Sequence, residues 1–497
     1  MAAAAAGLPP EREARRIRLH FESLGPQYSC FNLYLASRLD VLPAEFCREL
    51  ALTPDVAAPL SAEEIQKVLA RGYGASFQQV FAEFDFVPFE AGLISQSHHA
   101  LLRTGAPVTA VVLRPWCWAL NEPSDTSSLP DAKIVKDCCG DWVADDLLNN
   151  FAAALRRKTD LTLAREAIEL MARDASSLEQ LYSRKTYPEL CTPGLLVFES
   201  QEEQRLDQLL QKRVQSTGTL AQLLCHVWLC QALHGHCFPV DPQLHNVFLR
   251  DEKQISFLHC DMAGLPPGVR ENLQNYFAAL LADDPDRAAM YLLREMSPSK
   301  GGKIDPDSFR SSFRQAAYFG MLEPVLGADS NALAQLVFQH WKTAQEHGYS
   351  PKPHLLCFYR GLFCMARLAR TTSPSGDPLR AGMDELRSFN AFGQLREIMD
   401  WRYWLKNSDK FASALVQLPH TFDDALTRVS GPQSSAFPEQ APFPSRERRA
   451  APVAIMVVLL MLIIVISKLS HSQAWPEKII ALALMLTGVL VLRGSEH

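Results

Sequence analysis

The sequence lacks several features that identify common protein classes. Its 497 residues contain only 12 cysteines, no two of which form a CxxC pair, which argues against a zinc ribbon, a thioredoxin-like site and a disulfide framework. Neither sign of charge dominates, because 49 basic residues face 55 acidic ones. A net charge of -6 gives no reason to expect a nucleic-acid partner.

We expect no cleaved secretory signal peptide at the start of the chain. Pro9, Pro10, Glu11 and Glu13 interrupt the region where such a signal requires an unbroken apolar stretch. The alanines and arginines of the first residues leave an organellar transit peptide open as an alternative. We find no internal repeat at periods of about 20 to 50 residues.

The overall composition is that of a folded globular protein. Hydrophobic residues make up 47% of the chain and charged residues 21%, values close to the average for soluble domains. A chain of this length exceeds a single ordinary core, so we expect two or three structural units.

Two apolar segments near the C-terminus predict a membrane hairpin. Residues 450–466 and 479–492 carry no charged side chain, and the first reaches the roughly 17 to 25 residues that cross a bilayer. Arginines flank the pair on both outer sides, whereas only two lysines lie between the segments, which predicts that both ends face the cytoplasm. The alternative is a buried pair of soluble helices. The proline-rich residues 429–449 before them read as a tether.

The rest of the chain reads as mixed helix and strand, followed by helix. Apolar spacing at Leu220, Leu223, Leu224 and Val227 predicts an amphipathic helix, and helical patterns dominate residues 270–428. β-branched or apolar runs between turn signals predict strands over 108–113 and 195–198, and a hairpin over 246–249 and 255–258.

Seven segments carry a resemblance to a known family. They are residues 24–43, 81–102, 108–115, 160–167, 186–199, 238–249 and 258–264. In this order and spacing the chain resembles the UbiB family, the aarF-domain or ADCK-type atypical kinases linked to ubiquinone biosynthesis. The resemblance implies an α+β, protein-kinase-like two-lobed fold with an extra N-terminal helical region, followed by the C-terminal transmembrane helical hairpin.

This resemblance implies the following domains. They are an N-terminal helical extension (1–75), a kinase-like N-lobe (76–200), a helical C-lobe (201–428), the tether (429–449) and the two-helix hairpin (450–493).

Several positions depart from the pattern of active family members. The KxGQ motif that lies over the nucleotide site corresponds to residues from Cys30 to Leu33 and has lost its lysine, glycine and glutamine. The strand lysine that would pair the α and β phosphates corresponds to Val111, whose isopropyl group cannot replace an ammonium. Glu90 lies in the segment that matches the alanine-rich loop, where a carboxylate would repel phosphates.

The catalytic segments are only partly kept. In the family pattern HxDxHPGN, Asp241 corresponds to the catalytic aspartate, a remnant base, and Asn246 to a metal-binding asparagine. His259 replaces the main magnesium-binding aspartate, and imidazole is a poor ligand for that ion. Asp261, two residues later, could bind metal only in a rebuilt turn. Glu166 matches the glutamate that pairs with the missing lysine, so the resemblance makes it, with Asn246, a remnant of the nucleotide site.

These losses predict a pseudokinase that binds ATP and Mg²⁺ weakly or not at all. The resemblance implies a role in isoprenoid-quinone biosynthesis, with membrane lipids, quinone precursors or biosynthetic proteins as partners, no nucleic acid, and a homodimer left open. It implies a body on the cytoplasmic side of a membrane, with a bacterial inner membrane favoured over a mitochondrial one. One alternative is an active ATPase or kinase with rewired metal ligands that extracts quinone precursors from the membrane. A second is a lipid carrier without a nucleotide step.

Histidine and cysteine clusters have simpler interpretations. Cys225 and Cys230 lie near several histidines, but their spacing favours buried thiols over a zinc site. For His98 and His99 we expect a place on a helix surface rather than a catalytic role.

Overall fold

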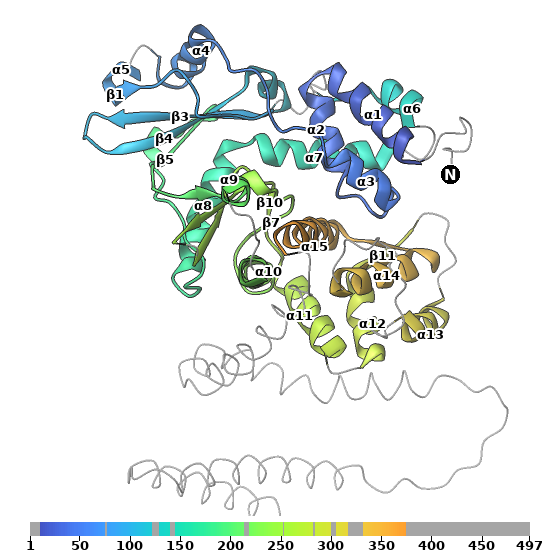
Figure 1. Ribbon diagram of the computed structural model, residues 1–497. Helices are drawn as coiled ribbons and strands as arrows, with labels where there is room; N and C mark the ends of the chain where they lie inside the picture. Colours follow the sequence, from blue (N-terminus) through green and yellow to red (C-terminus); the bar gives the residue numbers. More distant parts are fainter. Residues whose placement is uncertain are drawn as a thin grey trace, which may run out of the picture. The chain divides into compact units, whose positions relative to one another are not determined.

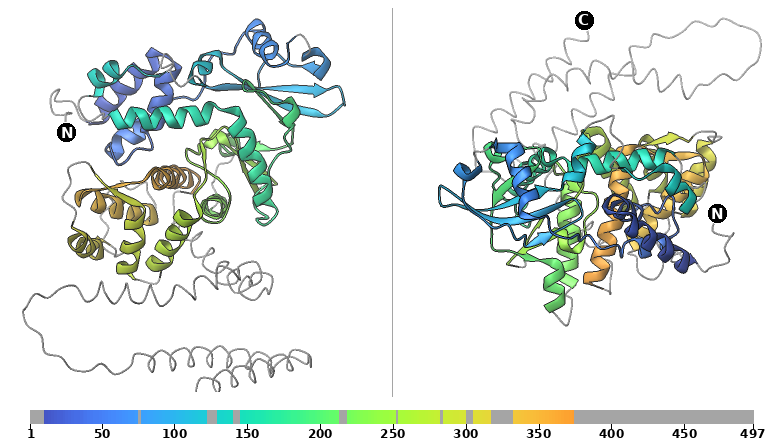
Figure 2. Two further views of the ribbon diagram at one scale, coloured as in Figure 1. Left: turned by 180° about the vertical axis from the view of Figure 1, so that it is seen from behind. Right: turned by 90° about the horizontal axis from the view of Figure 1, so that it is seen from above.

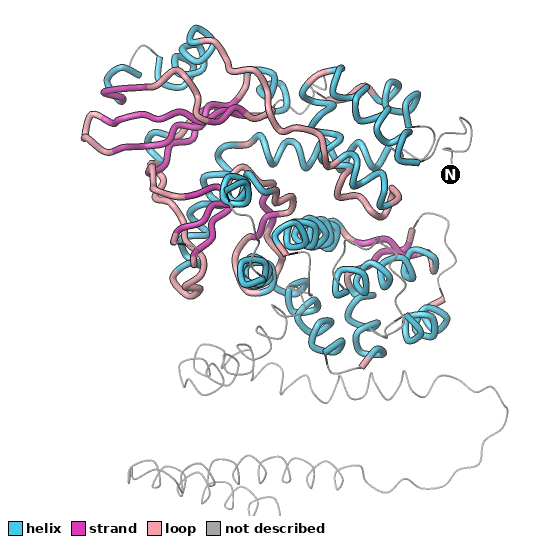
Figure 3. The backbone as a smooth tube through the Cα atoms, in the orientation of Figure 1, coloured by secondary structure: helices cyan, strands magenta, loops and turns pink. Residues whose placement is uncertain are grey.

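The computed structural model describes residues 10–74, 77–121, 129–139, 145–212, 218–251, 253–281, 284–299, 305–316 and 332–373. The chain divides into two compact units, residues 1–403 and 404–497, and all the described residues belong to the first. Strands are confined to one antiparallel sheet and a few short pairs, and helices form most of the remainder (Figure 3).

The described α-helices are α1 (Pro10–Leu24), α2 (Pro26–Leu35), α3 (Ala44–Leu50), α4 (Ala62–Tyr73), α5 (Phe77–Val80), α6 (Ala132–Cys139), α7 (Asp145–Thr159), α8 (Leu161–Ala175), α9 (Leu206–Lys212), α10 (Gly218–Leu233), α11 (Pro267–Leu281), α12 (Pro285–Arg294), α13 (Pro306–Ala316), α14 (Ala332–Glu346) and α15 (Pro353–Thr372). Three short 3₁₀ helices are η3 (Pro115–Asn121), η4 (Pro188–Leu190) and η5 (Leu244–Asn246).

The described strands are β1 (Phe81–Phe84), β2 (Glu90–Ala91), β3 (Ser95–Leu102), β4 (Pro107–Leu113), β5 (Leu195–Glu199), β6 (Gln204–Arg205), β7 (Phe238–Pro239), β8 (Val247–Arg250), β9 (Gln254–Phe257), β10 (Met262–Ala263), β11 (Met296–Pro298) and β12 (Tyr349–Pro351). The main sheet has the order β1-β3-β4-β5, and β2 pairs with β3. The short sheets are β6-β8-β9, β7-β10 and β11-β12.

The main sheet is buried on both faces, and its side chains alternate between two cores. On β4, Val108, Ala110 and Val112 pack with α4, whereas Val111 and Leu113 face the core shared with α7 and α8. This alternation follows from the two-residue period of a strand. Figure 1 shows α4 and α8 on opposite sides of the sheet. The alternation of side chains along β4 therefore places Val111 on the sheet face that packs toward α7 and α8.

The N-terminal helices pack against α7 through aromatic side chains. The ring of Phe151 on α7 lies 5.0 Å from Phe31 and 5.4 Å from Tyr34, both on α2. Figure 2 shows α7 running from these N-terminal helices to the start of α8. Asp160 caps α8, because its Oδ1 accepts the Thr162 N–H at 2.9 Å. The helical extension is thus joined to the region where α7 ends.

The helical part of the chain is built around α10, which is buried along most of its length. Trp228 is fully buried there and donates its indole N–H to the Pro239 carbonyl at 2.8 Å. Cys225 and Cys230 are buried in the same core, as expected from their spacing. α10 therefore supports the turn after β7, where Asp241 lies.

Most of the predicted elements are confirmed in this region, with one correction. β4 and β5 cover the predicted strands, and β8 pairs antiparallel with β9 as the predicted hairpin. The interpretation of His98 and His99 was wrong, because both lie on β3, where side chains alternate and His98 is buried. Residues 270–428, where helical patterns were expected to dominate, also contain the short strand pair β11 and β12.

The predicted tether and hairpin, residues 429–449 and 450–493, lie outside the described residues. Within the ranges that the structure describes, no helix has both the length and the apolarity that a bilayer crossing demands.

A buried histidine predicts a specific pH dependence of stability. Burial lowers the pKa of His340 to about 3, against about 6.5 in an unfolded chain. Because the unfolded state binds the proton more readily, the stabilisation is complete above pH 6.5 and is lost as the pH falls toward 3. Between pH 7.5 and 5 we expect His340 to remove about 2 kcal/mol from the free energy of unfolding.

Urea titrations of the wild type and of His340→Gln at both pH values check this expectation. The variant should lose less stability on acidification than the wild type. His99→Gln, at an exposed position on the sheet, should retain the wild-type dependence. Equal losses in the wild type and in His340→Gln would contradict the expectation.

Candidate functional site

A buried lysine and Asp241 form the centre of the site. Asp241 follows β7, and its Oδ2 lies 2.9 Å from Nζ of Lys158 at the end of α7. Its Oδ1 accepts the Asp261 backbone N–H at 2.7 Å. Both oxygens of the predicted catalytic aspartate are therefore engaged within the protein.

The position of Lys158 follows from the register of α7. Leu147, Phe151 and Leu155 form its buried stripe, and Lys158 continues that row by three residues, which keeps it on the same face. Burial opposes the charge of Lys158, but the carboxylates of Asp241 and Asp55 outweigh it and raise the pKa well above its usual value. Lys158 is thus a permanent cation inside the site.

Asp261 lies between two guanidinium groups. Arg157 donates to it from Nε at 3.0 Å and from Nη2 at 2.8 Å, a bidentate geometry that is strong and specific. Nη1 of Arg360 on α15 lies 3.4 Å from Oδ2. Arg360 also donates to Ser37 Oγ at 3.0 Å and lies over the Tyr34 ring. Asp261 therefore connects α7, α15 and the N-terminal extension.

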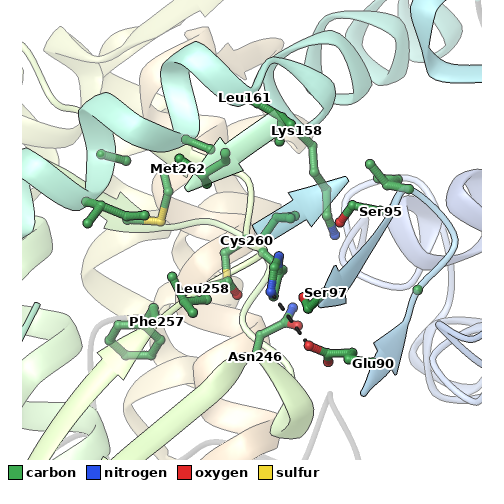
Figure 4. A pocket seen from close by; sticks show the side chains of 18 of the residues that line it. Glu90, Ser95, Ser97, Lys158, Leu161, Asn246, Phe257, Leu258, Cys260 and Met262 are labelled. Carbon is green, nitrogen blue, oxygen red and sulfur yellow. Dashed lines mark hydrogen bonds and ion pairs between the residues drawn. The ribbon is translucent and has the colours of Figure 1, made fainter. Parts of the chain in front are cut away.

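Asn246 has a different environment. It ends η5, is only 1% exposed, and neither polar atom of its side-chain amide has a nitrogen or oxygen hydrogen-bond partner among the described residues. The thiol of Cys260 lies beside it. The amide faces a cavity of about 70 Å³ (Figure 4), and buried amides without partners are uncommon enough to require an explanation.

Two histidine–carboxylate contacts join the segments around this cavity. His259 Nε2 lies 3.7 Å from Glu90 Oε2, and Glu90 also pairs with Arg205 at 3.2 Å. His245 Nε2 lies 3.3 Å from Asp55 Oδ2. Burial lowers the pKa of His259 despite Glu90, so its imidazole is neutral at pH 7.

Asp55 is held as a carboxylate. Its burial is outweighed by His245 and Lys158 and by the hydrogen bond from the Leu93 N–H, so its pKa lies well below the usual range. The lining of the cavity therefore includes the carboxylates of Asp55 and Glu90.

Most of the predicted site residues line two neighbouring cavities, and one of them, Glu166, lies elsewhere. Asp241, Asn246, Asp261 and His259 come together on adjacent turns, and Val111 lines the cavity from β4. Cys30 and Leu33 line a smaller cavity of about 30 Å³ with Lys158 and Asp241.

Glu166 is apart from this group. Its side chain is 56% exposed, and its ion pair is with Arg165 at 3.8 Å. Glu166 lines a separate cavity of about 350 Å³ between α8 and the start of α15, together with Leu163, Leu170 and Met262.

Residue-by-residue inspection missed the basic residues of the site. Lys158, Arg157 and Arg360 had no motif to mark them, although the buried stripe of α7 could have indicated that Lys158 points inward. In space, Lys158 stands beside Cys30, the first position of the segment that lost its motif lysine.

The arrangement does not fit Mg²⁺. That ion needs carboxylate oxygens free for octahedral coordination, and those of Asp241 and Asp261 are taken up by a lysine and two arginines. Within the described part of the chain, no group of three or more histidine, cysteine, aspartate or glutamate side chains is placed to hold a metal ion. The fold and the site thus define a kinase-like protein whose acidic groups are neutralised internally.

Comparison with known proteins agrees with this class. The model of the ABC1 atypical kinase-like domain matches residues 53–292. A probable protein kinase UbiB of Pseudomonas fluorescens is 24% identical over 442 residues, which cover 84% of this chain and 78% of the relative. The same protein of Shewanella woodyi is 25% identical over 379 residues, 73% of this chain and 67% of the relative.

The chain belongs to the UbiB family of ABC1 atypical kinase-like proteins. A solved structure, the complex of Rv3197 with erythromycin from Mycobacterium tuberculosis, covers 71% of this chain and 90% of its own, at 16% identity and a TM-score of 0.44. A likeness of that size carries no argument about the site.

Proposed function

We propose that this chain is a membrane-anchored pseudokinase that supports isoprenoid-quinone biosynthesis by binding lipid precursors or biosynthetic enzymes. The observation that carries the proposal is the ion pair between Lys158 and Asp241. Phosphoryl transfer depends on positioning and on neutralising the phosphate charge with metal ions. In this site the predicted catalytic aspartate, Asp241, is instead bound by the ammonium of Lys158.

The geometry around the pair supports the same proposal. Asp261, the nearest carboxylate that could replace the missing metal ligand, is bound by Arg157 and Arg360. Val111 presents an apolar surface where a phosphate-binding lysine would stand, and Glu90 adds a carboxylate to the lining. A cavity of about 70 Å³ is also small beside the 300 to 1,000 Å³ typical of ligand sites.

The cavity lined by Glu166 supports the lipid-binding part of the proposal. Its volume of about 350 Å³ lies within the usual range for ligand sites. Leu163 in its wall is 42% exposed, and the charged side chains of Arg157 and Glu166 are part of its lining. An amphipathic molecule matches such a mixture of apolar and charged lining.

The anchor in this proposal is the apolar pair of segments within residues 450–493, joined through the tether 429–449. Their length and the arginines outside them support a two-pass arrangement with the body on the cytoplasmic side. A bacterial inner membrane is the favoured location, with a mitochondrial membrane as the alternative.

A thermal-shift titration of the full-length chain with ATP, with and without Mg²⁺, tests the proposal. A ligand at 100 times its dissociation constant adds about 2.7 kcal/mol to stability, a shift of a few degrees for a body of this size. We expect no magnesium-dependent shift at millimolar ATP. A magnesium-dependent shift that Asp241→Asn abolishes would overturn the proposal.

The second candidate is an ATPase that drives extraction of quinone precursors. The observation that favours it is the turn itself, because Asp241 still accepts the Asp261 N–H and is followed closely in the chain by Asn246, at the end of η5. Magnesium-dependent ATP hydrolysis that Asp241→Asn eliminates would establish this activity. The absence of hydrolysis by the wild type would reject it.

A further inference from the structure

The cavity beside Asn246 has one polar end and one apolar end. Glu90, Ser95, Ser97 and the ammonium of Lys158 lie toward one side of it, and Phe257, Leu258 and Met262 lie toward the other (Figure 4). The apolar end is closed by side chains of the sheet and of α8, namely Val111, Ala167, Ile168, Met171, Leu196 and Phe198. A molecule in this cavity would contact hydrocarbon on one side and hydrogen-bonding groups on the other.

The size of the cavity limits what it can hold. One water needs about 10 to 15 Å³ on the same scale, so a volume of about 70 Å³ accommodates about five waters. That is the space of one small ring with a single substituent, and it is too small for a nucleotide.

Asn246 defines the polar recognition. Asn246 is only 1% exposed. Both its side-chain carbonyl oxygen and its amino group lack nitrogen or oxygen partners among the described residues. An amide is a donor beside an acceptor. A ligand that forms hydrogen bonds with both groups must itself present an acceptor beside a donor. A buried amide without hydrogen-bond partners lowers the stability of the protein.

The charges around the cavity select against ions. Asp55 and Glu90 place two carboxylates at the lining, which disfavours an anion. A cation gains little from these carboxylates, because Glu90 already pairs with Arg205 and Asp55 already contacts His245. The ammonium of Lys158, bound to Asp241 at 2.9 Å, also lies in the same lining. Burial of any unpaired charge against the apolar wall would add a further cost.

From these observations we propose that the cavity binds a small, uncharged, planar molecule that carries a hydrogen-bond donor beside an acceptor, as a carboxamide does on a single ring. Asn246 forms the reciprocal pair with the ligand, and the ring packs between Val111 and Ala167. The inference rests on the proposed function in one respect, namely that a nucleotide is not the ligand of this site.

Benzamide is the probe for the test, with benzoate and toluene as matched ligands. Saturation-transfer NMR on the full-length chain should detect benzamide with a dissociation constant on the order of 1 mM. Benzoate, which adds the negative charge, and toluene, which lacks the amide, should each bind at least about tenfold more weakly. No detectable benzamide binding, or equal binding of all three ligands, would overturn the inference.

Two variants locate the binding. Asn246→Leu removes the amide at nearly constant volume and should abolish the benzamide signal, while its melting temperature stays equal to or above that of the wild type because an unpaired polar group is removed. Val111→Phe should abolish the signal by filling the apolar end. His99→Gln, at an exposed position on the sheet and outside this cavity, should keep it.

The outcomes separate this inference from the proposed function. Benzamide binding that persists in Asn246→Leu would overturn the inference, and a large loss of stability in that variant would overturn the ligand role of the amide. Neither result would affect the pseudokinase proposal. Magnesium-dependent binding of ATP that displaces benzamide would overturn both.

Discussion

Lys158→Met is expected to lower the free energy of unfolding by about 3 to 5 kcal/mol. The substitution keeps the length of the side chain and removes the ammonium that lies 2.9 Å from Asp241. The side chain of Asp241 is only 16% exposed, and its other oxygen is already committed to the Asp261 N–H. The loss is large because a buried carboxylate would be left without its counter-ion.

A double variant separates the charge from the packing. In Lys158→Met with Asp241→Asn no buried charge is left unpaired, so we expect most of the lost stability to return. Urea denaturation of the full-length chain followed by circular dichroism measures both effects. Lys67→Met breaks a solvent-exposed pair with Glu63 and should leave the midpoint unchanged. A small effect of Lys158→Met, similar to that control, would show that the central ion pair is not a structural element.

Asp261→Asn has the second large expected effect. The change keeps the shape of the side chain but removes the charge that balances Arg157 and Arg360. Arg360 is only 3% exposed, so its guanidinium would be left buried without an ionised partner. We expect a loss of about 3 to 5 kcal/mol in the free energy of unfolding.

The same variant distinguishes a structural carboxylate from a metal ligand. A metal ligand held among like charges would be destabilising without its ion, so Asp261→Asn would then raise the urea midpoint. If Asp261 is instead a structural partner of two arginines, Asp261→Asn should lower the urea midpoint. Asp286→Asn, which removes an exposed pair with Arg314, is the matched control and should have little effect. An increase in stability of Asp261→Asn would favour a metal site at this turn.

The family resemblance could be recognised from the sequence because each matching segment is a short continuous stretch of the chain. The turn after β7 holds Asp241 and Asn246 within a few residues of each other, so their neighbourhood could be read directly from the sequence. The same is true of β4, whose β-branched run predicted a buried strand and placed Val111 on it. His98 was misassigned because its neighbours do not alternate clearly, and burial on β3 depends on what covers the sheet.

The sequence by itself determined the order of the elements and the family, and it predicted which positions depart from the catalytic pattern of that family, because propensity, periodicity and motif spacing act over short distances. Only the tertiary structure decided which charged groups surround those positions. Lys158 and Asp241 are 83 residues apart, and Arg360 is 99 residues from Asp261. Such pairs form only when helices pack, since burial turns distant opposite charges into partners and leaves the Asn246 amide facing a cavity without one.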